Sequence, residues 1–423
     1  VSERDFTTDR LSVIGRHRDL SDPVALEPGQ RLDGRQGAVK DPCFAQRLLV
    51  RLEPGATLVC DWLLGEAMSE TQLSDLLQRY AEPSAIGAAF DDAVAFWDDL
   101  VSRVQVETPE PAIDLMLNGW LLYQNLGCRI WARSAFYQSG GAYGYRDQLQ
   151  DAAALAAIRP DITRAQILLH AAHQFVEGDV LHWWHPAPLE RGLRTRFSDD
   201  LLWLPFVTAH YVRVTGDVGV LDELQPYLTA PELAPGQDEN YLAPEFSGES
   251  GDLYDHGCRA IDRSLTHGAH GLPLMGTGDW NDGMNRVGRE GRGESVWMGF
   301  FLYRVLSDFL PLCERRGDQA RIDRYRACQA ELERALEISG WDGDWYRRAY
   351  YDDGTPLGSA ADRECRIDAL AQSWAALSGA VPRVRAEQAL NALERHLASE
   401  PGRLIRLLTP PFVDTPRDPG YIK

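Results

Sequence analysis

Residues 276–288 have the sequence GTGDWNDGMNRVG. Two carboxylates, Asp279 and Asp282, flank the indole of Trp280, and the surrounding glycines favour a tight, exposed loop over a buried helix. One interpretation is an Asx-rich turn whose carboxylates only accept hydrogen bonds from backbone N–H groups. The other is a site for sugar chemistry, because a carboxylic acid can protonate a glycosidic oxygen and an aromatic face stacks on a pyranose ring.

The loop lies between two segments with helical periodicity, 251–267 and 293–315, and helix and loop alternate along most of the chain. Residues 113–133 are apolar nearly all round, which predicts a helix buried on most faces. The other expected helices are a pair within 69–103 and segments near 147–158, 162–176, 198–215, 217–227, 319–338, 363–379 and 384–398. This pattern predicts a mainly α fold, an α/α barrel or toroid with a site at one end. An α-solenoid is the alternative, although no fixed sequence period supports it.

The N-terminal part has a different pattern. Residues 1–45 are rich in Gly, Pro, Arg and Asp with little periodicity, which predicts a loop-rich segment. Apolar residues then alternate within 48–52 and 58–62, on either side of Pro54–Gly55, which predicts a β-hairpin. Because a lone hairpin is marginal in water, we expect it to form the last strands of a sheet that begins upstream of Val1.

Composition limits the function classes. The formal net charge of -20 argues against a surface for nucleic acid or anionic membranes, but it is compatible with a local basic pocket for a small anion. No apolar run reaches the roughly 18 to 20 residues that span a bilayer, and residues 2–10 lack the pattern of a signal peptide. The seven cysteines are scattered without a CxxC pair, which predicts a reduced, intracellular protein with neither a disulfide framework nor a zinc site.

The segment 137–151, YQSGGAYGYRDQLQD, places Arg146 and Asp147 at the expected start of a helix. The guanidinium fork of Arg146 suits a phosphate or a carboxylate, and Asp147 can accept hydrogen bonds from sugar hydroxyls. The alternative is an acidic first helical turn beside a surface arginine.

Two more loops are expected at 178–186, GDVLHWWHP, and at 192–200, GLRTRFSDD. In the first, His182 and His185 lack a third ligand at a useful spacing, so we favour an aromatic wall over a metal site. In the second, Ser198 is a candidate helix N-cap.

The carboxylates that follow Ser198, Asp199 and Asp200, fit a first helical turn at least as well as a site formed with Arg194 and Arg196. We expect His256, on a predicted helix, to be a packed or hydrogen-bonded residue rather than a catalyst.

A family resemblance rests on six stretches that occur in a fixed order. They are GGAYGYRDQLQD (140–151), HWWHP (182–186), GLRTRFSDDLLWLP (192–205), GTGDWNDGMNRVGREGRGESVW (276–297), RRAYYDDGTPLG (347–358) and ECRIDALAQSWAALSGA (364–380). The chain resembles the glycoside phosphorylases of glycoside hydrolase family 94, which include cellobiose, chitobiose and 1,2-β-oligoglucan phosphorylases and the phosphorylase-like domain of cyclic β-1,2-glucan synthases. Within the family, the sequences of residues 279–297 and 25–43, the latter ALEPGQRLDGRQGAVKDPC, are most similar to the β-1,2-glucan branch.

The resemblance implies a β-sandwich, a helical linker and an (α/α)6 barrel. In this chain, residues 1–65 would be the last strands of the sandwich, 66–105 the linker, and 106–423 a barrel truncated at its C-terminal end. The implied reaction is the reversible, inverting phosphorolysis of a β-glucoside, with the β-1,2 linkage favoured, to α-glucose 1-phosphate. Inorganic phosphate is the co-substrate, and neither a cofactor nor a metal is implied.

The resemblance also implies roles for single residues. Asp282 would be the general acid that protonates the leaving oxygen. The substrate-binding residues would be Tyr145, Arg146, Asp147, Asp151, Asp279 and Trp280. An inverting hydrolase needs a second carboxylate to activate water, whereas phosphate is already an anionic nucleophile. The acid must hold its proton near neutral pH, which requires burial or a neighbouring anion, and Asp279 is the candidate neighbour.

The expected partners are a β-linked gluco-oligosaccharide and phosphate, with no nucleic acid and no membrane contact from this segment. A homodimer, further domains on both sides and a cytoplasmic location, as such or as the cytoplasmic part of an inner-membrane protein, are also expected. In the relatives, an ENG-type motif, a His and a Thr-containing loop follow the position of GYIK (420–423) and complete the phosphate site. We therefore expect the 423 residues alone to have an incomplete phosphate pocket and weak or no phosphorolysis.

Two other function classes stay open. An inverting glycoside hydrolase would need a base, for which Asp147 and Glu249 are candidates. A glucan-binding or chain-length-controlling domain of a cyclic β-1,2-glucan synthase would need no catalysis at Asp282.

Overall fold

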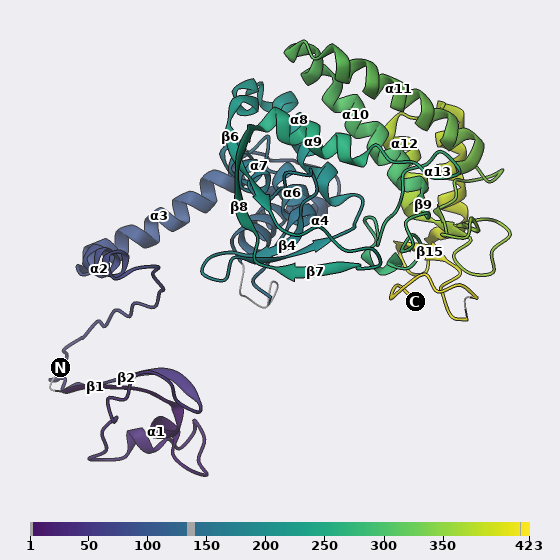
Figure 1. The fold of residues 1–423 in the computed structure, drawn as a ribbon. Coiled ribbons are helices and arrows are strands. Elements are labelled where there is room, and N and C mark those ends of the chain that lie inside the picture. The colour runs from purple at the N-terminus through teal and green to yellow at the C-terminus, as the bar shows by residue number, and fades with distance from the viewer. Residues whose placement is uncertain (1–2, 133–139, 415) are drawn as a thin grey trace. The chain divides into compact units, whose positions relative to one another are not determined.

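The computed structural model describes residues 3–132, 140–414 and 416–423 (Figure 1). The chain forms two compact units, Val1–Ala93 and Val94–Lys423. Helices dominate the second unit, as the sequence pattern predicts. Of the segment 137–151 that we singled out from the sequence, residues 137–139 lie outside the described residues.

The first unit contains an antiparallel pair of strands, β1 (Glu3–Asp9) and β2 (Pro42–Leu49). A short helix, α1 (Arg10–Ile14), and a 3-10 turn, η1 (Val24–Leu26), lie between these strands in the sequence. Asp5 and Arg47 face each other across the strands, and Arg47 donates hydrogen bonds of 3.1 and 2.5 Å to the Asp5 carboxylate. The hydrogen bond from Arg47 lowers the pKa of Asp5.

The hairpin predicted at 48–62 is wrong. Pro54–Gly55 does form a turn, closed by the Ala56 N–H, which donates to the Glu53 carbonyl at 2.9 Å. Residues 50–67, all of which are described, form no strand. The partner of β2 is the remote segment 3–9, which has too little apolar alternation to be recognised as a strand within the loop-rich region expected at 1–45.

The two helices predicted within 69–103 are confirmed as α2 (Glu70–Arg79) and α3 (Pro83–Ser102). The Ser69 side chain accepts a hydrogen bond from the Gln72 N–H and so starts α2.

The long helix predicted at 113–133 exists, but its expected burial on most faces is wrong. It consists of α4 (Pro111–Leu115), η2 (Met116–Trp120), α5 (Leu121–Gln124) and η3 (Asn125–Trp131), and η2 and η3 are π-helical. Leu122, Leu126 and Ile130 pack against Leu100 and Leu155. On other faces, by contrast, large apolar side chains are exposed, as at Ile113 (46%), Leu115 (73%) and Trp120 (49%). Periodicity predicts the helix but not which of its faces has a neighbour.

The central helix of the second unit is α10 (Val296–Arg316), which contacts α8 (Trp203–Thr215), α11 (Gln319–Ala335) and α12 (Ala369–Ser378). The Ser295 side chain caps its N-terminus by accepting from the Met298 N–H, and Gly317, with φ of 68°, ends it in the left-handed conformation. Among the described helices, α10 is the one long and apolar enough to cross a membrane, but 72% of its apolar window is buried within the protein. It is therefore a core helix.

The remaining long helices surround this core and confirm most of the predicted positions. They are α6 (Tyr145–Ala153), α7 (Pro160–Ala171), α9 (Leu253–Ser264) and α13 (Arg383–Leu397). The helix predicted at 217–227 is wrong, because a 3-10 turn, η6 (Val218–Asp222), leads into strand β6 (Leu224–Thr229), which pairs with β8 (Glu245–Asp252). Pro226 lacks the N–H that a helix interior needs.

A four-stranded antiparallel sheet borders helices α6 and α7, in the order β3 (Tyr143–Gly144), β4 (Leu181–His185), β5 (Arg191–Thr195) and β7 (Glu239–Leu242) (Figure 1). Two of its strands lie where loops are predicted, at 178–186 and 192–200. The short strands were missed because their partners, β3 and β7, are remote in sequence and supply the pairing that stabilises them.

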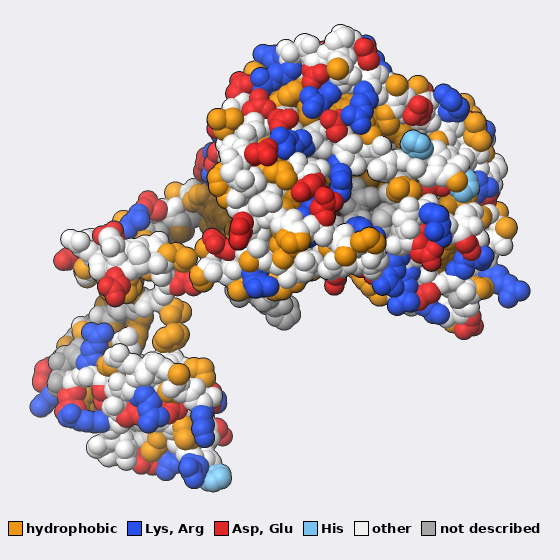
Figure 2. Space-filling model, viewed as in Figure 1, with side chains coloured by type: hydrophobic (Ala, Val, Ile, Leu, Met, Phe, Trp, Pro, Cys, Tyr) orange, Lys and Arg blue, Asp and Glu red, His pale blue; other side chains and the backbone are white. Residues whose placement is uncertain are grey.

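On the face of the molecule shown in Figure 2, acidic and basic side chains are interspersed. The net charge of -20 is therefore not gathered into a single acidic patch on that face.

Candidate active site

Arg146, in the first turn of α6, bonds to two segments that are remote from it in sequence, one at Asp199 and one at residues 279–282. Its Nη2 donates to Asp282 Oδ1 at 2.8 Å, and its Nη1 donates to Asp199 Oδ2 at 3.1 Å and to the Asp279 carbonyl at 3.4 Å. Burial alone would lower the pKa of Arg146, but the charges of Asp199, Asp200 and Asp282 outweigh burial and raise the pKa. The guanidinium is therefore a permanent cation that holds the carboxylate of Asp282.

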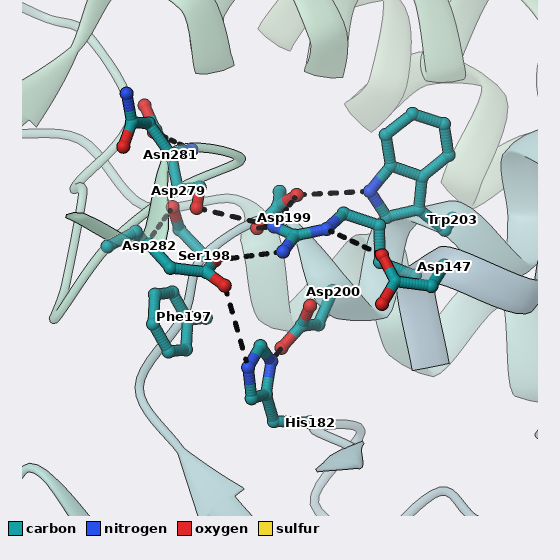
Figure 3. Close-up of polar contacts among 12 residues, drawn as sticks. Asp147, His182, Phe197, Ser198, Asp199, Asp200, Trp203, Asp279, Asn281 and Asp282 are labelled. Atoms are coloured by element: carbon teal, nitrogen blue, oxygen red, sulfur yellow. Dashed lines mark hydrogen bonds and ion pairs between the residues drawn. The ribbon is translucent and has the colours of Figure 1, made fainter. Parts of the chain in front are cut away.

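His182, on β4, lies between two carboxylates (Figure 3). Its Nδ1 is 2.8 Å from Asp200 Oδ2, its Nε2 is 3.9 Å from Asp282 Oδ2, and its ring stacks on Phe197 at 4.6 Å. Burial alone would lower the pKa of His182, but Asp200, by its charge and its hydrogen bond, and the charge of Asp282 raise the pKa to about 9. At neutral pH the ring is an imidazolium that donates to Asp200.

Asp199 is fully buried, and its carboxylate accepts from Arg146 and, at 3.0 Å, from Trp203 Nε1. Burial raises the pKa of Asp199 to about 7, even though the charge of Arg146 opposes this shift. The predicted N-cap at Ser198 is wrong, because its hydroxyl donates to the Gly278 carbonyl at 3.2 Å instead. This bond links the 3-10 turn η5 (Asp200–Leu202) to the 276–288 loop.

The 276–288 loop is anchored through Asp279, whose side chain is fully buried. Its carboxylate accepts from Arg348 at 2.6 and 2.7 Å, from the Ser295 hydroxyl at 2.7 Å and from the Asn281 N–H at 3.1 Å. Burial alone would raise the pKa of Asp279, but Arg348, by its charge and its hydrogen bonds, lowers it. Asp279 is therefore an anion that fixes the loop.

Glycine is required at Gly276, where φ is 63° and a Cβ would lie 2.0 Å from the Arg196 carbonyl. The Asn281 side chain accepts from the Gly283 N–H at 3.1 Å, as in an Asx turn. The Asx turn of the first interpretation is therefore present, and its hydrogen bonds shape the turn that presents Asp282. A 3-10 turn, η7 (Asp282–Met284), begins at that residue.

Asp282 opens into a small cavity. Its side chain is 32% exposed, and that of Asp147, whose Oδ1 lies 4.0 Å from Arg146 Nε, is 53% exposed. The residues that line the cavity are Gly144, Tyr145, Arg146, Asp147, His182, Trp183 and Asp282. Trp280, in the same loop as Asp282, is partly exposed.

Tyr145 also lines this cavity, and its ring is fully buried against His170 and Trp184. Asp151 is not part of the lining, since it accepts a hydrogen bond from Arg129 at 2.8 Å on the side of α6 that faces η3. The structure thus brings Tyr145, Arg146, Asp147 and Asp282 together at one cavity and leaves Asp151 and Asp279 outside its lining.

The C-terminal residues pack directly on the 276–288 loop. The Ile422 N–H donates to the Gly283 carbonyl at 2.7 Å, and the Tyr421 N–H donates to Asn285 Oδ1 at 3.2 Å. Far from this contact, His256 is a packed helix residue as predicted, since it is fully buried, stacks on Tyr227 at 4.0 Å and bonds to Gln174.

His182, Asp199 and Asp200 are site residues that the sequence analysis considered but did not assign to this site. No spacing rule links 182 with 199–200, because β5 and its turns lie between them. The detectable signal is the paired carboxylates at the start of a predicted helix, which fit the helix equally well.

The helix-rich second unit thus presents a carboxylate beside arginine, histidine and tryptophan at one open cavity, an arrangement compatible with sugar binding. Comparison with protein families identifies the class. Residues 96–423 match the catalytic domain of the glycosyl hydrolase 94 superfamily, and residues 1–83 match the glycosyl hydrolase 94 supersandwich domain. The chain belongs to this family.

Three relatives show the range of the family. The chain is 47% identical to the cyclic beta-(1,2)-glucan synthase NdvB of Rhizobium meliloti (strain 1021), over 99% of this chain and 15% of that protein. It is 29% identical to the N,N'-diacetylchitobiose phosphorylase of Vibrio furnissii, over 99% of this chain and 52% of that one. It is also 29% identical to the solabiose phosphorylase of Paenibacillus borealis, over 98% and 50%. The chain thus spans about half the length of these phosphorylases and less of the synthase.

Proposed function

We propose that this chain supplies the acid-bearing part of an inverting glycoside phosphorylase that acts on β-1,2-gluco-oligosaccharides and yields α-glucose 1-phosphate. Its family membership and its similarity to two proteins named phosphorylases support the reaction class. Similarity to a protein named a cyclic beta-(1,2)-glucan synthase supports the linkage. An (α/α)6 barrel is the fold that belongs with this proposal.

The observation that carries the proposal is the position of Asp282, which is half-buried between Arg146 and His182 at the mouth of the cavity. As a phosphate oxygen forms its bond to C1 of the glucosyl unit, the bond from C1 to the glycosidic oxygen breaks. That oxygen takes the proton of Asp282. The imidazolium of His182 then lies 3.9 Å from the carboxylate that has gained a negative charge, and it stabilises this charge.

This geometry assigns Arg146 to the sugar side of the reaction in our proposal. An inverting nucleophile approaches the face of the ring opposite the acid. Arg146 is bonded to the acid itself, so the attacking phosphate needs other cations. Asp147, beside Arg146 in the same cavity, is left to accept hydroxyls of the glucosyl unit.

The test is an assay of the full-length natural protein that contains these residues, with β-1,2- and β-1,4-gluco-oligosaccharides, with and without phosphate. We expect glucose 1-phosphate to form only with phosphate, and Asp282→Asn to lower its rate by about 100- to 10,000-fold. Phosphate-independent release of glucose that is lost in Asp147→Asn would instead identify a hydrolase and refute the proposal.

A second candidate is a glucan-binding or chain-length-controlling domain of a membrane-bound cyclic glucan synthase, with this segment on the cytoplasmic side. The 47% identity to NdvB favours it. In that case the oligosaccharide binds, no phosphate-dependent product forms, and Asp282→Asn leaves both binding and the size distribution of the glucan product unchanged.

A further inference from the structure

The sheet that carries His182 also presents aromatic side chains outside the catalytic cavity. In the register of the sheet, Trp183 on β4 lies opposite Leu193 on β5, which in turn lies opposite Tyr241 on β7. His185 lies opposite Arg191 in the neighbouring row. Residues directly opposite one another, and residues two apart on one strand, share a face of the sheet. These five side chains therefore share one face, which we call the β4–β7 face.

The rings on this face contact one another. The Trp183 ring lies 5.5 Å from that of Tyr241 and 5.4 Å from that of His185, centroid to centroid. The guanidinium of Arg191 lies 4.9 Å from the Tyr241 ring centroid, and Tyr241 itself is 40% exposed. Arg191 Nη2 donates a hydrogen bond to the Tyr241 carbonyl at 3.3 Å. A partly exposed aromatic ring and a guanidinium group thus lie side by side on this face.

Trp183 connects this face to the chemistry, because it also lines the cavity that contains Arg146, Asp147 and Asp282. β7 is the outer strand of the four-stranded sheet, so the β4–β7 face runs from the cavity at Trp183 to the sheet edge at Tyr241. Counted outward from the cavity, a linear ligand would therefore pass Trp183 first and Tyr241 next.

We propose that the β4–β7 face binds the glucosyl units of a β-linked gluco-oligosaccharide that lie beyond the bond at Asp282. Aromatic faces bind the apolar faces of pyranose rings, and the guanidinium of Arg191 beside Tyr241 can donate to their hydroxyls. Neutral sugar hydroxyls need no compensating charge, which suits a face whose one cation, Arg191, already lies against an aromatic ring. The inference rests on the proposed function for the position of the reacting bond, and it deepens that function by adding a preference for three or more glucosyl units.

The test is isothermal titration of the 423-residue chain carrying Asp282→Asn with β-1,2-linked glucobiose and with the corresponding glucopentaose. We expect Tyr241→Ala to weaken binding of the pentasaccharide about three- to tenfold and to change binding of the disaccharide less than twofold. Tyr241→Phe, which keeps the ring, retains tight binding. The matched control is Tyr123→Ala, which removes another half-exposed tyrosine packed on tryptophans, Trp97 and Trp120, and leaves both affinities unchanged.

Equal weakening for both ligands, no weakening for the pentasaccharide, or no pentasaccharide binding at all would overturn this site. Failure of the proposed reaction is a separate result. A protein that binds pentasaccharide through Tyr241 but forms no glucose 1-phosphate keeps the site and loses the phosphorylase assignment. If the protein forms the product, and the KM for pentasaccharide is the same in the wild type and in Tyr241→Ala, the phosphorylase assignment stands and the proposed site is refuted.

Discussion

Replacement of Arg348 by methionine is expected to destabilise the protein strongly, because it breaks a fully buried ion pair. Arg348 and Asp279 are both 0% exposed at their side chains, and two hydrogen bonds of 2.6 and 2.7 Å join them. Arg348 also lies 3.6 Å from the buried Asp368 carboxylate. Methionine fills similar space but supplies neither charge nor donors, so the charge of Asp279 is left without its cation in the core.

The expected cost follows from the burial of the partner that remains. Loss of one member of a buried pair costs about 3 to 5 kcal/mol. Two unit charges about 4 Å apart at an effective dielectric constant near 20 give an interaction of about 4 kcal/mol, which agrees. Since domains are stable by about 5 to 15 kcal/mol, this one change removes between about a fifth and all of a typical total. The 276–288 loop then loses its anchor.

The assay is urea unfolding of the full chain at pH 7, monitored by tryptophan fluorescence. The matched control is Arg383→Met, which breaks an exposed pair with Glu387 in which Arg383 is 91% exposed, and which is expected to leave the unfolding free energy nearly unchanged. The double variant Asp279→Asn with Arg348→Met is expected to be more stable than the sum of the single changes predicts. An Arg348→Met variant within about 1 kcal/mol of the wild type, or strict additivity, contradicts this account.

Two further predictions concern the same site. His182→Asn is expected to destabilise the protein by an amount that depends on pH. Folding raises the pKa of His182 from 6.5 to about 9. The protonated ring therefore contributes about 3 kcal/mol to the free energy of unfolding below pH 6.5, and this contribution is lost as the pH rises through 9. Unfolding free energies measured from pH 6 to 10 check this, and a difference from wild type that does not vary with pH refutes it. Ser295→Ala removes both the N-cap of α10 and a donor to Asp279, so we expect a loss of about 1 to 2 kcal/mol in thermal unfolding. Ser295→Thr is expected to retain most of the wild-type stability. An Ala variant as stable as the wild type would show that the Ser295 cap does not stabilise α10.

The local sequence pattern was sufficient to predict a helix where the signal lies within that helix. The position of α6, with Arg146 and Asp147 in its first turn, follows from residues 143–151, and α10 follows from its apolar run and flanking Ser and Gly. It was insufficient for β4, β5 and β7. These strands are four to five residues long. β4 and β5 pair with each other nearby, but their other partners, β3 and β7, are about 40 to 50 residues away in sequence.

The site itself was predictable only in part. Arg146 and Asp282 were identified as motif residues, but their contact spans 136 positions, and that between Arg146 and Asp199 spans 53. Residues such as Asp199 and His182 gain their shifted pKa values only from those contacts, because burial and neighbouring charges set a pKa and neither is visible in a local sequence.

Asp279 and Asp282 show how far two carboxylates three residues apart can diverge. Sequence suggested that Asp279 would act on Asp282, but its carboxylate instead bonds to Arg348, a residue 69 positions further on. Asp282 starts a 3-10 turn and faces the open cavity, where Arg146 bonds to its Oδ1 and His182 lies 3.9 Å from its Oδ2. We therefore expect loss of Asp279 to lower stability, and loss of Asp282 to lower turnover in a protein that still folds. Comparing unfolding free energy with turnover in the two Asn variants separates the anchor of the loop from the proposed acid.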